Sequence, residues 1–404
     1  GADKVVGYDQ YFGGSQDNGT FLSPRNLIAD ETTTWSFEIG GDGFEAIAHH
    51  TDPNKLIGGS QGNNFYRSTN GGASWSYAQY GLEGADPFIT RLSSPAQDPD
   101  VLYAVTNFGV MKSNDFGESW QAKQVEGNWN SSFWSGTDVE VSLANPRYVW
   151  AGSSMSFAGN IFLSKDWGET YESVPNFSSL GRTSGIYSHP TEDSTAYVLF
   201  GMPGAAKVLQ TRDLGETWED LSGFTNSTDG KSLNGFPDVP VYSFLVMPHD
   251  KDIMWAGTEV GLIESTDGGE SWHLVESNLP YVTIWDLKLK DEGQIVIATH
   301  GRGVWTATID DLKSYEPKPA ILPPFILSAY QLDSEDSYVI STNINTKSSY
   351  DSLVIKANNV KRDVFQNVDK SDSTNFVFEV DDKGDYTIQA LSLIHISEPT
   401  RRTT

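Results

Sequence analysis

The sequence predicts an all-β protein: a β-propeller of about seven blades, followed by a small, truncated β-sandwich. A short signature, Ser/Thr-x-Asp/Asn-x-Gly-x-Ser/Thr-aromatic, occurs five times at intervals of roughly 45 to 55 residues. Such an interval accommodates one four-stranded antiparallel sheet, which is the unit of a propeller blade. Proline-containing turns and short apolar strands recur between the signatures, and a proline-rich stretch precedes a second β-rich segment.

The five signatures, called boxes below, share one turn chemistry. A short Asp or Asn side chain accepts hydrogen bonds from backbone amides of its own turn, and the glycine adopts positive φ. The final aromatic residue is expected to pack between neighbouring sheets. We therefore expect the central residue of each box to be structural, and these residues are Asn70, Asp115, Asp166, Asp213 and Asp267.

These boxes resemble the Asp-box (BNR) repeats of sialidases, two-propeller xyloglucanases, sortilin-type receptors and photosystem II assembly factors. The resemblance covers about residues 1–312 and implies a secreted propeller of bacterial type. Because the group includes enzymes as well as proteins that only bind a ligand, the resemblance implies a fold rather than one function.

Composition restricts the class of partner. Lys and Arg total 27 against 54 Asp and Glu, a formal net charge of -27, so the surface repels phosphate backbones and anionic lipids. We expect no nucleic acid and no membrane insertion, and a polysaccharide or extracellular protein as ligand. The chain has no cysteine, and its seven His show no metal-ligand spacing, so no cofactor and no metal are expected. An extracellular or cell-surface location fits these properties.

The expected domain boundaries follow the repeats. Residues 1–312 form the propeller, whose first blade, Val5–Phe37, lacks an inner strand and a box. Residues 313–324 form a Pro-rich linker, and 325–390 alternate apolar and polar residues as in an immunoglobulin-like β-sandwich. Residues 391–404 resemble the translation of a sequencing adapter and are expected to be non-native, so the natural sandwich would continue beyond Ala390.

Chain direction sorts the loops onto two faces, because successive strands of a blade are antiparallel. The proline turns and boxes share the box face, whereas segments leading into inner strands and loops between second and third strands share the opposite face, called the rim face. Carboxylates expected there are candidate catalytic residues: Asp42, Asp138 and Glu259. Candidate ligand-binding residues on the same face are Gln16, Asp17, Gln61, Asp86, Asn107, Trp129, Trp134, Arg182, Asp238, His300 and Arg302.

Three functions remain open at this stage. A pair of carboxylates could act as acid and base in glycoside hydrolysis, with exposed indoles stacking on sugar rings. Alternatively, the propeller binds a protein or peptide without catalysis, as the resemblance to sortilin-type receptors implies. A sialidase-type enzyme would need three arginines around a carboxylate, and Arg91, Arg182 and Arg302 lie near the right strand ends.

Overall fold

The computed structural model describes residues 10–311 apart from 26–28, 85–86, 128, 158 and 291–292, together with the backbone of six further strands between residues 325 and 391. The chain divides into two compact units, residues 1–317 and residues 318–404. Each unit is treated by itself. The expected linker at 313–324 lies outside the described residues.

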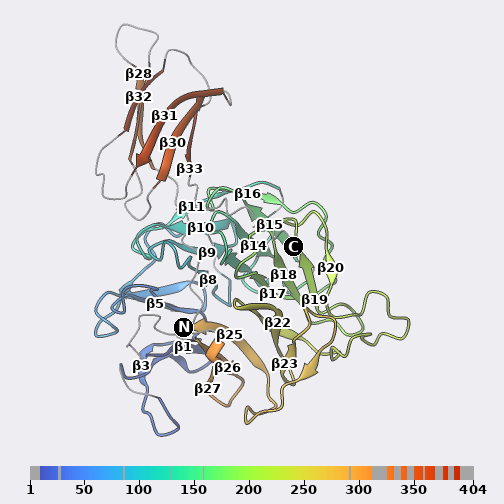
Figure 1. Ribbon diagram of the computed structural model, residues 1–404. Helices are drawn as coiled ribbons and strands as arrows, with labels where there is room; N and C mark the ends of the chain where they lie inside the picture. Colours follow the sequence, from blue (N-terminus) through green and yellow to red (C-terminus); the bar gives the residue numbers. More distant parts are fainter. Residues whose placement is uncertain are drawn as a thin grey trace. The chain divides into compact units, whose positions relative to one another are not determined.

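The first unit is an all-β propeller of seven blades (Figure 1). Most blades are meanders, in which strands adjacent in sequence pair antiparallel. Blades 1 to 3 are β1–β3 (Phe12–Ser15, Gly19–Leu22, Ser36–Ile39), β4–β7 (Ala46–Ala48, Leu56–Ser60, Asn64–Ser68, Ser76–Tyr77) and β8–β11 (Leu92–Ser93, Leu102–Thr106, Gly109–Ser113, Gln121–Ala122).

Blade 4 carries an extra edge strand. The short β12 (Gln124–Val125) pairs in parallel with the outer strand β16. The remaining strands of blades 4 to 7 are β13–β16 (Asp138–Val141, Val149–Ser153, Asn160–Ser164, Thr170–Ser173), β17–β20 (Thr183–Ser188, Ala196–Phe200, Val208–Thr211, Glu219–Asp220), β21–β24 (Val241–Met247, Asp250–Thr258, Gly261–Ser265, His273–Leu274) and β25–β27 (Ile284–Lys290, Gln294–Thr299, Val304–Thr308).

Blades 1 and 7 differ from the other five blades, and for blade 1 the repeats predict the missing box. Among the described residues each has three strands, and neither has a box. The two blades meet where the Tyr11 hydroxyl donates a hydrogen bond to Gln294 Oε1 at 2.9 Å, and Tyr11 is buried together with Val296 of β26. The ring therefore closes through side-chain packing between its first and last blades.

Apolar clusters lie between neighbouring blades rather than within single sheets. One such cluster joins Ile57 and Phe65 of blade 2 to Leu102 and Met111 of blade 3. The box aromatics take part, as expected: Trp120 is buried and its Nε1 donates to the Ala78 carbonyl of the preceding blade at 2.9 Å. The strands are held as a ring because each sheet buries both of its faces.

All five boxes adopt the same hydrogen-bond pattern. The central Asp or Asn Oδ1 accepts a hydrogen bond from the opening Ser or Thr hydroxyl at 2.7–2.9 Å and another from the amide four residues later at 2.8–2.9 Å. The opening hydroxyl in turn accepts the glycine amide at 2.8–2.9 Å. Each turn satisfies its own polar groups, so these side chains are not available to a ligand.

Three boxes contain a strained residue that the sequence pattern does not predict. The residue before the conserved glycine has a left-handed φ, and in three boxes it is bulky: Phe116 (54°), Trp167 (67°) and Leu214 (59°). Phe116 is buried and meets the His49 ring of the preceding blade edge-on, with ring centroids 5.1 Å apart. Packing against the neighbouring blade offsets backbone strain of about 1 kcal/mol.

Replacing Asp115 with alanine should lower the free energy of unfolding by about 1–2 kcal/mol, since it removes three local hydrogen bonds. Asp115→Asn is the matched control and should cost far less, because Asn70 makes the equivalent Oδ1 contacts in the first box. Chemical denaturation of both variants measures the difference. Equal losses in the two variants would show that charge, rather than the acceptor oxygen, stabilises the turn.

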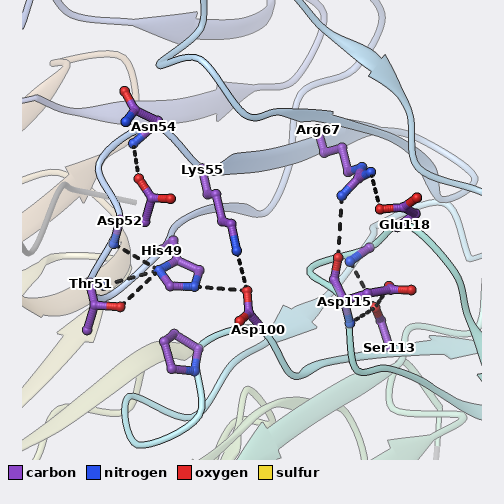
Figure 2. A network of polar contacts seen from close by, with 12 residues as sticks. His49, Thr51, Asp52, Asn54, Lys55, Arg67, Asp100, Ser113, Asp115 and Glu118 are labelled. Carbon is purple, nitrogen blue, oxygen red and sulfur yellow. Dashed lines mark hydrogen bonds and ion pairs between the residues drawn. The ribbon is translucent and has the colours of Figure 1, made fainter.

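The buried His49 organises the turn between β4 and β5 on the box face (Figure 2). His49 Nδ1 accepts the amides of Thr51 and Asp52 at 3.2 and 3.0 Å, and its Nε2 lies 3.2 Å from Asp100 Oδ1 in blade 3. Lys55 contacts the same Asp100 oxygen at 2.5 Å. Burial lowers the pKa of His49, although Asp100 acts in the opposite direction.

His189 repeats this arrangement in blade 5. Its Nδ1 accepts the amides of Thr191 and Glu192 at 3.1 and 3.0 Å, and burial lowers its pKa to about 4. In both turns the ring nitrogen must be unprotonated to accept the amides. These histidines therefore act as turn caps.

The second unit contains two three-stranded antiparallel sheets. One has the order β28–β29–β32 (Phe325–Gln331, Tyr338–Asn343, Phe376–Val380), and the other has the order β31–β30–β33 (Val360–Val368, Tyr350–Ala357, Tyr386–Leu391). Strand-rich structure agrees with the expected alternation, and the immunoglobulin-like sandwich remains a prediction. The expected non-native tail begins at the last residue of β33, and the rest of it lies outside the described residues.

Candidate functional site on the rim face

The strand directions bring the predicted site residues to one face. Asp42, Asp138, Arg182 and Asp238 lie at the starts of inner strands or just before them. Among the other candidates that the structure describes, Gln16 and Asp17 lie in the turn between β1 and β2, Trp129 and Trp134 precede β13, and the rest occupy turns between the second and third strands of their blades. Exposed and half-buried aromatic side chains gather on the same face in two groups. They are called the first and second platforms below.

The first platform consists of Phe44, Phe88, Phe133 and Trp134, from the segments leading into blades 2, 3 and 4. The Phe88 ring contacts all three of the others, with centroids 5.4, 5.5 and 5.0 Å away respectively. A backbone hydrogen bond of 2.7 Å from the Phe88 amide to the Phe133 carbonyl fixes the two segments together. Trp134 nevertheless leaves 67% of its surface exposed.

The two tryptophans predicted to bind ligand have different surroundings. Trp129 packs on Phe162 of blade 4 at 5.2 Å, and its Nε1 donates to the Thr106 carbonyl at 3.0 Å. Trp129 thus anchors the segment before β13, whereas Trp134 presents its indole to solvent. The sequence does not decide whether these indoles face solvent or the protein interior. In the structure Trp134 faces solvent and Trp129 packs inward.

The Asp42 carboxylate caps a loop. Its Oδ1 accepts the Asp17 amide at 2.7 Å, while its own amide donates to Gln61 Oε1 at 2.7 Å. The neighbouring Gly43 packs backbone to backbone: a Cβ there would lie 2.2 Å from the Gly19 carbonyl oxygen. The absence of a side chain at Gly43 therefore admits another chain segment.

Asp138 belongs to a buried ionic network in the central channel. Its two oxygens accept the amides of Val139 at 3.0 Å and Ile186 at 2.8 Å, and Arg91 Nε lies 3.9 Å away. Burial raises the pKa of Asp138, while Arg91 and the two amides act to lower it. With both oxygens engaged, the carboxylate stabilises the inner strands.

Glu45, which directly precedes β4 of blade 2, joins Arg91 of blade 3 to Lys288 of blade 7. One oxygen lies 3.6 Å from Arg91 and the other 3.7 Å from Lys288 of blade 7. The guanidinium of Arg91 is therefore paired with two carboxylates and is not free to hold a ligand's carboxylate, as a sialidase-type site would require. Nearby, burial raises the pKa of Glu140 to about 7.

Asp238, expected to bind ligand, is paired with a lysine. Its Oδ1 lies 2.6 Å from Lys207 Nζ and accepts the Gly204 amide at 2.9 Å. The Lys207 side chain is fully buried; it also donates to the Met202 carbonyl and lies over the Phe224 ring, 4.7 Å from its centroid. No sequence motif distinguishes Lys207 from a surface lysine.

The second platform consists of Tyr242, Trp285 and His300, from blades 6 and 7. The Tyr242 and Trp285 ring centroids are 4.4 Å apart. The Trp285 indole Nε1 donates to His300 Nδ1 at 3.1 Å, and 47% of Trp285 is exposed. Of these three residues only His300 was predicted from the sequence, because an aromatic residue inside a strand is expected to be part of the hydrophobic core.

Three charged candidates come from blades 5 to 7, which also carry the second platform: Glu259, Arg182 and Arg302. All three are exposed, and within the described part of residues 10–311 no hydrogen bond or ion pair engages their side-chain charges. Burial raises the pKa of the Tyr242 hydroxyl, the Glu259 charge raises it further, and Arg182 lowers it. Both charges thus act on the Tyr242 hydroxyl.

The remaining candidates lie in turns of blades 1 to 3. Gln16 is exposed, and its carbonyl accepts Asn18 Nδ2 at 3.0 Å. Asn107 Oδ1 is buried and makes no hydrogen bond within the described structure. Asp86 lies outside the described residues. Over the part of the chain that the structure describes, no group of three or more His, Asp or Glu side chains could hold a metal ion, and no helix could span a membrane.

No protein-family model matches the chain. The chain is 24% identical over 317 residues to a xyloglucanase of Hypocrea jecorina, covering 75% of this chain and 33% of that protein. It is 27% identical over 228 residues to the oligoxyloglucan-reducing end-specific xyloglucanase of Emericella nidulans, covering 50% of this chain and 28% of that protein. The chain thus spans about a third of the length of these xyloglucanases.

Two further comparisons concern the propeller itself. The photosystem II assembly lipoprotein Ycf48 of a Synechococcus strain is 28% identical over 276 residues, covering 66% of this chain and 70% of that protein. The crystal structure of the GH74 enzyme of Niastella koreensis superposes with a TM-score of 0.54 at 15% identity, covering 85% and 56%. The chain is therefore a seven-bladed β-propeller similar to GH74 xyloglucanases and to Ycf48.

Proposed function

We propose that the propeller is an extracellular protein that binds a neutral polysaccharide on its rim face, with the first platform stacking against the sugar rings. The observation that carries the proposal is the exposed indole of Trp134, held by Phe88 and Phe133. Similarity to two xyloglucanases supports xyloglucan as the first ligand to test.

The physical basis is the two-sided character of a pyranose ring. Its C–H face is apolar and its edge carries hydroxyls, so it stacks on an aromatic plane while polar groups receive the hydroxyls. A rigid ring cluster loses little conformational entropy on binding, which favours affinity. The net charge of -27 disfavours anionic polymers and is indifferent to neutral ones.

The candidate carboxylates favour binding over hydrolysis. Hydrolysis requires two carboxyl groups at about 5–10 Å that are free to reach the scissile bond, whereas Asp42 and Asp138 accept backbone amides. Glu259 is exposed and favours the enzymatic alternative, in which it acts with a second carboxylate. Binding of a peptide without catalysis, as in a sortilin-like protein, is the other alternative.

Replacing Trp134 with alanine is expected to weaken binding of xyloglucan about tenfold, because one stacked ring contributes roughly 1–1.5 kcal/mol. Titration calorimetry with soluble xyloglucan measures the affinity. Tyr77→Ala is the matched control, since Tyr77 is 73% exposed on the outer strand of blade 2. Equal affinity of the Trp134 variant and the wild-type protein would refute the proposed role of the platform.

The same samples distinguish binding from hydrolysis. A binding protein releases no new reducing ends from xyloglucan, and the variants Asp42→Asn and Glu259→Gln then change nothing in that assay. Release of reducing ends that disappears in Glu259→Gln would instead establish the enzymatic alternative. Failure of the wild-type protein to bind xyloglucan would leave the peptide-binding alternative.

A further inference from the structure

We propose that the second platform, Tyr242, Trp285 and His300, is a separate sugar-binding site that opens and closes with the protonation of His300. The inference rests on the proposed function for its ligand class, a neutral pyranose. It has its own geometric basis in blades 5 to 7. None of its residues belongs to the first platform, which is built from blades 2 to 4.

The second platform presents one aromatic plane, the Trp285 indole, whose orientation is fixed by contacts with its neighbours. Trp285 is the second residue of the inner strand β25, and Tyr242 is the second residue of the neighbouring inner strand β21. Backbone contacts fix both neighbours: the Tyr242 carbonyl accepts the Tyr187 hydroxyl at 2.9 Å, and the His300 amide donates to the Thr283 carbonyl at 2.8 Å. The hydrogen bond to His300 then sets the orientation of the exposed indole.

The polar groups around this plane can form hydrogen bonds with the hydroxyls of a sugar ring. Glu259 supplies an acceptor and Arg182 and Arg302 supply donors, and their charged groups have no partner in the described part of the propeller. Charges of both signs flank the platform, so hydrogen-bond donors and acceptors are both present. A neutral sugar with donor and acceptor hydroxyls uses both kinds of group.

The contact between Trp285 and His300 depends on protonation. The indole N–H can only donate, so His300 Nδ1 must be unprotonated to accept it, and the ring proton lies on Nε2. Adding a second proton turns Nδ1 into a donor and breaks the bond. Imidazole is the side chain that undergoes this change between pH 5 and 8.

The charged groups on the surrounding elements are Glu259, on the turn between β22 and β23, Arg302, on the same turn as His300, and Arg182, ahead of β17. Asp286 and Lys288 on β25 form an ion pair at 3.7 Å, and Tyr242 on β21 is the remaining titratable neighbour. Protonation releases the indole, and the platform loses its fixed plane.

The first measurement is the pH dependence of binding. The measurement uses Trp134→Ala as the background, because the first platform is proposed to bind the same sugar. In this background the dissociation constant for a xyloglucan oligosaccharide should rise about fivefold from pH 8 to pH 5, since one orienting hydrogen bond is lost. With His300→Asn added, the amide oxygen accepts the indole at every pH, so affinity should be independent of pH. With Trp285→Ala added, binding should be weak at pH 8 and show no pH dependence. Equal pH dependence with and without His300→Asn would overturn the proposal.

The second measurement needs no ligand. The indole N–H resonance of Trp285, identified by its absence from Trp285→Phe, should shift between pH 8 and pH 5 in the wild-type protein and stay fixed in His300→Asn. A resonance that does not move in the wild-type protein overturns the switch. Absence of xyloglucan binding at any pH overturns the proposed function and the ligand class of this site, while the indole titration still decides the switch.

Discussion

Replacing Asp238 with alanine is expected to lower the free energy of unfolding of the propeller by about 3 kcal/mol. The substitution leaves the ammonium of Lys207 buried without its carboxylate, and removing one partner of a buried pair costs about 3–5 kcal/mol. The lower value applies because 41% of the Asp238 side chain is exposed. Denaturant unfolding, followed by the fluorescence of the tryptophans, measures the loss.

A double variant, Asp238→Ala with Lys207→Met, is the control. It removes both charges and keeps the unbranched side chain over Phe224, so most of the lost stability should return. A loss below about 1 kcal/mol in Asp238→Ala alone is the size expected of an exposed pair and would contradict the structural role. Asp238 would then again be a candidate ligand-binding residue, as the sequence predicted.

Acidification below pH 6.5 is expected to remove the stability that the neutral His189 contributes to the propeller. His189 must be neutral to cap its turn, and its pKa falls from 6.5 to about 4 on folding. The stability that it contributes is therefore complete above pH 6.5 and is lost progressively as the pH falls toward 4, by about 3 kcal/mol in all. His49, whose pKa is also lowered, adds to the same loss.

The pH dependence of the melting temperature between pH 7.5 and 4 tests this expectation. His189→Asn keeps a side-chain acceptor near the position of Nδ1 and has no proton to gain, so its melting temperature should fall less over this range. Below pH 4 the box carboxylates, with lowered pKa values such as that of Asp267 at about 2, take over as the source of acid sensitivity. Parallel curves for the variant and the wild-type protein would rule out His189 as the sensor.

The propeller was predictable because its determinants are local and repeated. A box such as Ser113–Trp120 satisfies its polar groups within eight residues, so its chemistry can be recognised without knowing the rest of the chain. The spacing of the boxes then gave the seven blades, and the alternation of strand direction gave the face on which the candidate residues lie. The incomplete first and last blades were also recognisable, because they lack a box.

The site was less predictable because its contacts join distant segments. Asp238 meets Lys207 across a loop, and Asp138 meets Arg91 from another blade. Sequence spacing says nothing about such partners, so carboxylates that stabilise the fold looked available for chemistry. Trp285 was missed for the opposite reason: its place in an inner strand predicts burial, while the structure leaves it exposed at the channel mouth.

Phe116, Trp167 and Leu214, the non-glycine box residues with left-handed φ, mean that the blades of this propeller cannot be interchanged freely. Their counterparts Gly71 and Gly268 reach the same backbone geometry without strain. A chimera that transplants the box of blade 3 into blade 5 would carry a strained phenylalanine away from the histidine that receives it, since the turn of blade 4 at Ser142–Asn145 contains no histidine. Transplanting the box of blade 6, with Gly268 at this position, into blade 3 would leave a hole beside His49. Recombination among these repeats therefore has to exchange adjacent pairs, since the unit that folds well is a blade together with the blade before it.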